Sequence, residues 1–141
     1  MDKKKVCISF DYDNDRNYKN LLSAWDANSD FEFIFNDVTP SEINSNNIDR
    51  IKAVLTQKIG SAIYLLVIIG KYANARDKNS DLIGDLNWIN WEINKAKYFP
   101  KKLVGVKIER SYESPYALKN SDTSWAYSFT QEGIINALNN A

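Results

Sequence analysis

The feature that most constrains the fold is an alternation, along the whole chain, of short apolar segments with segments of helical periodicity. The most apolar segment, residues 62–70 (A-I-Y-L-L-V-I-I-G), has the length and β-branched content of a central strand covered on both faces. Four further strands are predicted, at residues 5–10, 31–35, 102–109 and 125–129.

Amphipathic helices are predicted at residues 47–60 and 87–97 and around the apolar positions 18–25 and 134–138. Asn14 or Asp15 is expected to cap the first helix after a loop at 11–14, and Ser128 and Gln131 have capping-box spacing before the last. The alternation predicts right-handed βαβ units and a parallel sheet with helices on both faces. Five strands favour a three-layer flavodoxin-like fold with the order 2-1-3-4-5, formed by residues 1–141 as a single domain.

The charge and hydropathy of the chain limit its partners. Its 141 residues include 18 lysines and arginines and 18 aspartates and glutamates, so a zero net charge argues against bulk attraction to nucleic acid or to a membrane. No apolar run approaches the roughly 20 residues that span a bilayer, and the apolar run after the N-terminus is too short for a signal peptide. The single cysteine, Cys7, has no internal disulfide partner, and a cytoplasmic location is expected.

The chain contains no histidine. This excludes Ser-His-Asp and Cys-His triads, histidine general bases and histidine metal ligands. With one cysteine, a structural zinc site is excluded as well, and no metal is expected. Any catalysis must use carboxylates, lysines, hydroxyls, aromatic rings or backbone groups.

The third predicted helix has two faces of different character. Ile89 and Ile93 repeat at helical spacing and indicate the packing face, which Trp91 is expected to join. Trp88 and Glu92 are four residues apart and lie one above the other on a second face. Trp88 is interpreted as a packing residue, a substrate contact or both. The helix N-terminus is expected to favour an ionised Glu92.

Ligands of open α/β sheets bind beyond the carboxyl ends of the strands, near the switch in strand order. The candidates at that rim follow strands 1 to 3 or begin the third helix: Phe10, Asp11, Tyr12, Asp37, Gly70, Tyr72, Trp88 and Glu92. The polar segment 72–86 is a long loop for a compact domain, and such loops are often functional. The aspartates also have the ordinary interpretation of turn or cap residues.

Other α/β families fit these residues less well. A response-regulator receiver needs a phosphorylatable aspartate at the end of strand 3, where this chain has I-G-K at 69–71. A haloacid-dehalogenase-type phosphatase uses two aspartates after strand 1; Asp11 and Asp13 fit in part, but residues 14 and 15 depart from its pattern. The acidic residues also suggest a calcium loop, but its glycine position is Arg16. Gly-rich phosphate loops are absent.

Three motifs, taken in order, resemble those of TIR domains. Residues 6–10, V-C-I-S-F, followed by acidic residues and Arg16, are similar to the first-strand motif of that family. Residues 67–73, V-I-I-G-K-Y-A, resemble the third strand and its exit, and Trp88-x-x-x-Glu92 matches the tryptophan and glutamate spacing of the third TIR helix. The order of elements fits throughout, and the likeness is to bacterial TIR-like proteins of Thoeris-type anti-phage defence.

The resemblance implies an enzyme that cleaves NAD+ at the nicotinamide–ribose bond, with NAD+ as substrate and no other cofactor. In enzymatic TIR domains the glutamate at the position of Glu92 is catalytic, and the ADP-ribose-derived product acts as a signal. For this chain it implies a separate effector protein as partner, and it allows a homo-oligomer. Nicotinamide leaves as a neutral molecule, so one carboxylate suffices to stabilise the oxocarbenium-like ribose. Trp88, Tyr72, and Phe10 or Tyr12 would form an aromatic shelf for the substrate.

A second interpretation belongs to another functional class. The chain would then be a non-enzymatic TIR-like scaffold or protein-binding module that signals by self-association. Glu92 would be an ordinary solvated glutamate, as most helical glutamates are. An assay of NAD+ cleavage separates the two interpretations.

Overall fold

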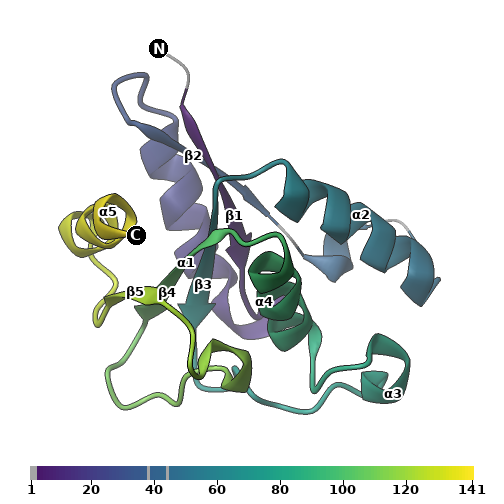
Figure 1. Ribbon diagram of the computed structural model, residues 1–141. Coiled ribbons are helices and arrows are strands. Elements are labelled where there is room, and N and C mark those ends of the chain that lie inside the picture. Colours follow the sequence, from purple (N-terminus) through teal and green to yellow (C-terminus); the bar gives the residue numbers. More distant parts are fainter. Residues whose placement is uncertain (1–2, 38, 44) are drawn as a thin grey trace.

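The computed structural model describes residues 3–37, 39–43 and 45–141, without the side chains of Asp37 and Glu42. In this part of the chain, five parallel strands form one sheet in the order β2-β1-β3-β4-β5 (Figure 1). The strands are β1 (Lys4–Ser9), β2 (Phe33–Asp37), β3 (Tyr64–Ile69), β4 (Lys102–Lys107) and β5 (Thr123–Ala126). The predicted strand order and flavodoxin-like class are therefore confirmed.

Helices cover both faces of this sheet. They are α1 (Tyr12–Asp26), α2 (Ile48–Gly60), α3 (Ser80–Ile83), α4 (Trp88–Tyr98) and α5 (Gln131–Asn140), with 3-10 turns η1 (Pro40–Glu42) and η2 (Tyr116–Leu118). Helices α2 and α4 pack on one face, and α1 and α5 pack on the other (Figure 1). Within the described residues, no helix has the length and hydropathy to cross a membrane.

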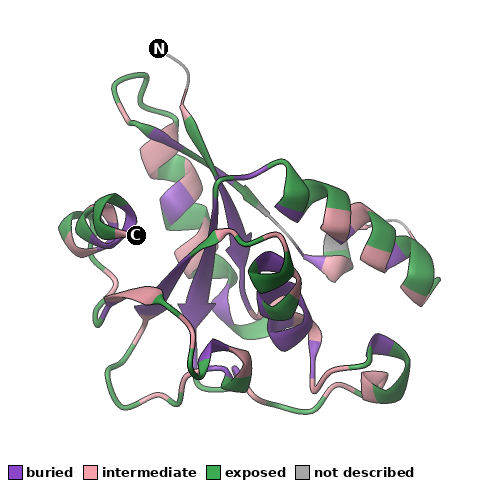
Figure 2. Cartoon of the chain, in the orientation of Figure 1, coloured by how far each residue is buried: buried purple, intermediate pink, exposed green. Residues whose placement is uncertain are grey.

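Strand β3 is the centre of the molecule. All six of its residues are buried, as predicted for a strand covered on both faces, and Figure 2 shows the buried residues gathered along the central strands. Because successive side chains of a strand point to opposite faces, Leu65, Val67 and Ile69 pack with α2 and α4. Leu66 and Ile68 pack with α1 and α5 on the other face.

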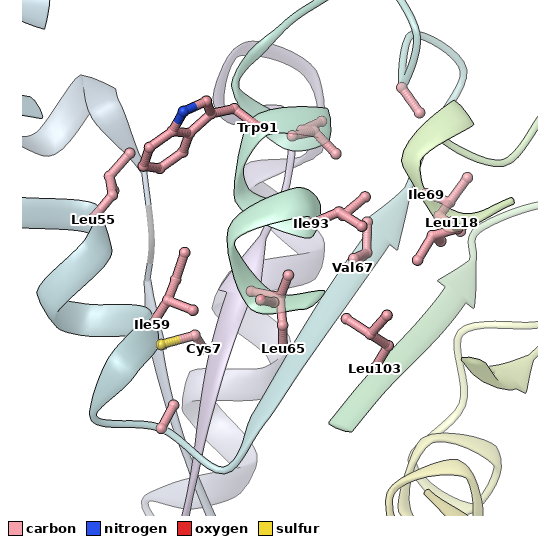
Figure 3. Packing of buried hydrophobic residues seen from close by; sticks show 14 of the residues in the cluster. Cys7, Leu55, Ile59, Leu65, Val67, Ile69, Trp91, Ile93, Leu103 and Leu118 are labelled. Carbon is pink, nitrogen blue, oxygen red and sulfur yellow. The ribbon is translucent and has the colours of Figure 1, made fainter. Parts of the chain in front are cut away.

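The core on the α2 and α4 face contains Trp91. In Figure 3 the indole extends from α4 toward Leu55 of α2, and Ile59 and Cys7 of the same core lie below it in the view. Trp91 is only 8% exposed and Ile93 is fully buried. The predicted packing role of Trp91 and the apolar face of α4 are therefore confirmed.

Helix α1 begins earlier than predicted. Asp11 is its N-cap, since the Asp11 carboxylate accepts a hydrogen bond from the Asp13 backbone N–H at 3.2 Å. The predicted loop at 11–14 is thus the cap and first turn of the helix, and the predicted caps at Asn14 and Asp15 are wrong. A kink at Asp15, with φ −118° and ψ 15°, separates this first turn from the amphipathic part. The apolar periodicity begins only after the kink, so it could not indicate the earlier start.

Other element ends also differ from the predictions. Strand β2 continues to Asp37, the segment 72–86 contains the short helix α3, and Thr130 rather than Ser128 caps α5. Strand β5 begins two residues and ends three residues earlier than predicted, and its Trp125 pairs with Gly105 of β4. A Cβ at Gly105 would lie 2.6 Å from the Trp125 ring. The absent side chain thus leaves room for this ring, a tertiary contact that short apolar patterns do not specify.

Candidate functional site

A cleft with a volume of about 650 Å³ lies beyond the carboxyl ends of β1, β2 and β3. Its walls come from the β1–α1 junction, the segment after β2, the segment after β3 and the N-terminus of α4. The lining residues are Phe10, Asp11, Tyr12, Asp13, Asn14, Thr39, Pro40, Ser41, Tyr72, Ala75, Arg76, Asp77, Asn87, Trp88 and Ile89. The cleft lies where the strand order switches between β1 and β3, and roughly 300–1,000 Å³ is the usual range for small-molecule sites.

Five of the predicted substrate-contacting residues line this cleft: Phe10, Asp11, Tyr12, Tyr72 and Trp88. Four of them contribute aromatic rings from three different segments. The rings of Phe10 and Tyr12 are 6.2 Å apart between centroids, and Tyr72 is 49% exposed. The cleft therefore offers ring faces on which a planar ligand can stack.

Two predicted residues are placed differently. The Asp37 backbone ends β2 opposite Ile8, and its side chain lies outside the described part of the structure. Gly70 does not line the cleft. A Cβ at Gly70 would overlap the carboxylate of Asp15, so the absent side chain makes room for Asp15 beside the end of β3.

Asp15 was not predicted as a site residue. It is 7% exposed and lies at the kink of α1. Burial and, second, the charge of Asp11 raise the pKa of Asp15 from 3.8 to about 6. In the sequence Asp15 is one of several acidic residues after strand 1, and nothing there distinguishes a buried carboxyl from a solvated one.

Glu92 lies behind the cleft wall rather than on it. Trp88 and Ile89, one turn earlier on α4, line the cleft, whereas Glu92 is 1% exposed. The Ser9 hydroxyl at the end of β1 donates a 2.7 Å hydrogen bond to Glu92 Oε1. Glu92 Oε2 is buried and has no hydrogen-bond partner within the described residues. The expected position on the open rim is therefore wrong by about one turn of helix.

Burial decides the protonation of Glu92. Loss of hydration raises the pKa of Glu92 well above its usual value, and the Ser9 hydrogen bond lowers it by less. The expectation that the helix N-terminus favours the ionised form is therefore wrong for this conformation, because the pKa of Glu92 is raised. The helix N-terminus favours negative charge only within the first turn, and Glu92 is the fifth residue of α4. Desolvation is then the dominant effect.

Two buried asparagines hold the cleft loop against the N-terminus of α4. Asn87 Oδ1 accepts hydrogen bonds from the backbone N–H and from Nδ2 of Asn90, both at 2.9 Å. Asn87 Nδ2 donates to the carbonyls of Ala73 and Ala75, each at 2.9 Å. Asn90 Oδ1 accepts from the Ala117 N–H at 2.8 Å. The loop after β3 and the η2 segment are thereby attached to the helix that carries Trp88 and Glu92.

Asn74 extends this network. Its Nδ2 donates to Glu113 Oε1 at 2.8 Å and to the Ser114 carbonyl at 2.9 Å. Its Oδ1 accepts from the Tyr116 N–H at 3.0 Å and from Asn90 Nδ2 at 3.3 Å. Asn87 has the sequence signature of a helix cap, but the partners of Asn74 are 16 to 42 residues away along the chain. No local pattern could have identified them.

The cleft lining brings together charged residues that are far apart in the sequence. Asp11, Asp13 and Asp77 are its acidic residues among those described, and Arg76 is its cationic one. The Asp77 carboxylate accepts a hydrogen bond from the Asn79 N–H at 2.8 Å. Among the described residues, no group of three or more His, Cys, Asp or Glu side chains could hold a metal ion.

The chain is similar in fold to a solved structure and in sequence to a protein family, whereas no curated protein matches it. Among solved structures, a 2-desoxiribosyltransferase from Leishmania mexicana is similar with a TM-score of 0.55 and 12% identity, over 94% of this chain and 95% of that chain. At this identity the likeness shows the fold alone. A family model, "Thoeris protein ThsB, TIR-like domain", matches residues 7–113. This match spans most of the chain, from β1 through the Trp88–Glu92 helix, and the chain therefore belongs to the ThsB TIR-like family of Thoeris proteins.

Proposed function

We propose that this Thoeris TIR-like protein cleaves NAD+ between nicotinamide and ribose and releases an ADP-ribose-derived nucleotide that signals to a separate effector in anti-phage defence. One arrangement carries the proposal. A buried glutamate with an unpartnered oxygen, Glu92, lies directly behind a cleft that four aromatic rings line. A buried, unpartnered polar atom is costly in a folded protein, so its retention beside a cleft supports a functional role.

The chemistry of the cleft suits the two ends of NAD+. Aromatic faces such as those of Trp88 and Tyr72 can stack the nicotinamide or adenine ring. The negative charges of Asp11 and Asp13 would attract the cationic nicotinamide ring. Aromatic ring faces attract the same cation. The volume of about 650 Å³ fits a ligand of nucleotide size.

In the proposed reaction the bond between C1′ of the ribose and the nicotinamide nitrogen breaks, and both electrons leave with neutral nicotinamide. The ribose then carries oxocarbenium-like positive charge, which the carboxylate of Glu92 stabilises. A nucleophile bonds to C1′ and completes the substitution. When the nucleophile is water, the products are nicotinamide, ADP-ribose and one proton.

The buried position of Glu92 identifies the described conformation as a resting form in this proposal. Because Glu92 does not reach the cleft surface, a substrate can contact it only after side chains such as Trp88 and Ile89 shift. Exposure to the cleft would restore hydration and lower the pKa of Glu92 toward the usual value of about 4.3. The same movement would thus both expose and ionise the carboxylate.

The test is incubation of the protein with NAD+, followed by chromatography and mass spectrometry of the products. Glu92→Gln is expected to reduce nicotinamide release by at least about 100-fold, since it removes the negative charge that faces the ribosyl cation. Glu132→Gln, an exposed substitution of the same type on α5, is the matched control and is expected to keep full activity. Equal nicotinamide release by wild type and Glu92→Gln would contradict the proposal.

One observation favours the non-enzymatic scaffold as a second candidate: Glu92 does not line the cleft. The solvated glutamate that this interpretation expected is nevertheless wrong, since Glu92 is buried. The same assay, run on protein purified from phage-infected cells as well as from uninfected cells, separates the candidates. Glu92-dependent product from either preparation supports the enzyme. No product from both, together with concentration-dependent assembly in analytical ultracentrifugation, would support the scaffold.

A further inference from the structure

The described lining of the cleft has more acidic residues than basic ones, and they come from different segments. Asp11 and Asp13 come from the β1–α1 junction, whereas Arg76 comes from the segment after β3. Asp11 lies two residues after Ser9, whose hydroxyl contacts Glu92. The acidic wall thus follows directly on the hydrogen-bond partner of Glu92, whereas the single cation in the described lining lies on the segment that Asn87 attaches to the first turn of α4.

Arg76 has unused hydrogen-bonding capacity. The side chain is exposed, and its one hydrogen bond in the described part of the chain runs from Nη1 to Ser80 Oγ at 3.2 Å. The carboxylate of its neighbour Asp77 accepts a hydrogen bond from the Asn79 N–H. A guanidinium has five N–H donors in a planar fork, so most of those on Arg76 remain available to a ligand.

The acidic residue Asp11 has hydrogen-bond partners within its own segment. Asp11 accepts hydrogen bonds from the Asp13 N–H at 3.2 Å and from Asn14 Nδ2 at 2.7 Å. These bonds hold its carboxylate in place as a helix cap. An arginine with no carboxylate partner among the described residues, in an otherwise acidic cleft, is a position for a ligand anion.

We propose that Arg76 binds the pyrophosphate of a dinucleotide in this cleft and thereby sets its orientation and its specificity for phosphorylated ligands. The inference rests on the proposed function, since NAD+ carries a pyrophosphate and a cationic ring that need opposite surroundings. With the pyrophosphate on Arg76, the cationic nicotinamide end lies toward Phe10 and the acidic Asp11, which follow Ser9, the hydrogen-bond partner of Glu92. The reacting C1′ is then on the side of the proposed catalytic carboxylate.

The test compares two ligands, of which ADP-ribose contains the pyrophosphate and nicotinamide riboside contains no phosphate. Dissociation constants are measured by NMR titration of the full chain, which reaches weak affinities. Arg76→Gln is expected to weaken ADP-ribose binding by about 10- to 100-fold, the usual effect of losing a hydrogen-bonded ionic contact. Binding of nicotinamide riboside is expected to change less than about twofold, since that ligand has no anion for Arg76.

Two further variants serve as controls. Lys78→Gln removes a positive charge from an exposed residue of the same segment that does not line the cleft. It is expected to leave both dissociation constants within about twofold, because an exposed charge outside the cleft is screened by salt. Arg76→Lys keeps the charge but loses the planar fork, so an intermediate loss of ADP-ribose affinity is expected.

The outcomes separate this inference from the proposed function. Unchanged ADP-ribose binding in Arg76→Gln, an equal loss for both ligands, or no ADP-ribose binding by the wild type would each overturn the inference. If ADP-ribose binding depends on Arg76 but NAD+ is not cleaved, the inference stands and the enzymatic proposal fails. If NAD+ is cleaved with the expected Glu92 dependence but Arg76→Gln binds ADP-ribose normally, only the inference fails.

Discussion

At the scale of single residues, Glu92 is the group whose behaviour depends most on the fold. Its carboxyl has one hydrogen bond, from Ser9, and one oxygen without a partner within the described residues. An ionised carboxylate in such surroundings would lose its hydration with little in return. The folded protein therefore holds Glu92 in its neutral form at a pH where the unfolded chain would ionise it.

This difference predicts a pH-dependent stability. The pKa of Glu92 is raised by folding, so its contribution is fully present below the unfolded pKa of about 4.3 and is lost as pH rises toward the folded pKa. The wild type should lose up to about 1.4 kcal/mol of unfolding free energy per pH unit from this group. Glu92→Gln cannot ionise, so its stability relative to wild type should increase between pH 5 and pH 7.5, as measured by urea denaturation.

The difference in unfolding free energy between wild type and Glu92→Gln reports the ionisation of Glu92 alone. The pKa of Asp15 is also raised, to about 6, but Asp15 is present in both and its contribution cancels. The exposed substitution Glu132→Gln should differ from wild type by a constant, small amount across the range. A stability difference for Glu92→Gln that does not change with pH would show that Glu92 is ionised in the folded protein.

At the scale of elements, the N-terminus of α4 depends on its asparagine network. Asn87 caps the helix in the way that its position predicts, but its Nδ2 also binds the segment after β3. Asn90 then joins the helix to η2 through the Ala117 N–H. The wall of the cleft is therefore held by side-chain amides where no strand pairing reaches it.

Asn90→Ala should destabilise the protein by about 2–3 kcal/mol, because it leaves the part-buried Ala117 N–H without this acceptor and removes the side-chain bonds of Asn90 to Asn87 and Asn74. Urea denaturation measures the loss. Asn94→Ala, one turn later on the same helix, removes an exposed bond to Asp85 and should cost less than about 0.5 kcal/mol. Equal effects of the two substitutions would mean that the network contributes nothing beyond helix propensity.

At the scale of the whole molecule, Cys7 reports on the integrity of the sheet. It lies in β1, between β2 and β3, and is 2% exposed beneath α2. Its Sγ donates to the Lys58 carbonyl at 3.2 Å. Burial is the main cause that raises the pKa of Cys7 to about 11. Both the access of reagents and the formation of thiolate are therefore suppressed in the folded state.

Labelling of Cys7 by a maleimide at pH 7.5 should consequently require separation of α2 from the sheet. We expect the urea concentration at half-maximal labelling to coincide with the midpoint of unfolding followed by circular dichroism. Labelling well below that midpoint would reveal a local opening of α2 and would contradict the expectation.

The periodicity of the sequence decided the class of fold and the strand order. Alternation of strand and helix patterns leaves few right-handed parallel arrangements, and the length and β-branched content of the run at 62–70 fit the buried central strand that β3 forms. Rules for parallel sheets also indicated the rim at which Phe10, Tyr72 and Trp88 line the cleft. These inferences succeeded because they depend on local spacing and on general chain geometry.

Only the tertiary structure decided the depth and charge state of the candidate groups. Spacing places Trp88 and Glu92 on one helical face, but their different burial depends on how α4 packs against β1, where Ser9 lies. The same holds for Asp15, which is buried because Gly70 has no side chain, and for Arg76, whose place in an acidic cleft follows from loop geometry. Burial and charge pairing are sums over residues distant in the chain, so no local pattern contains them.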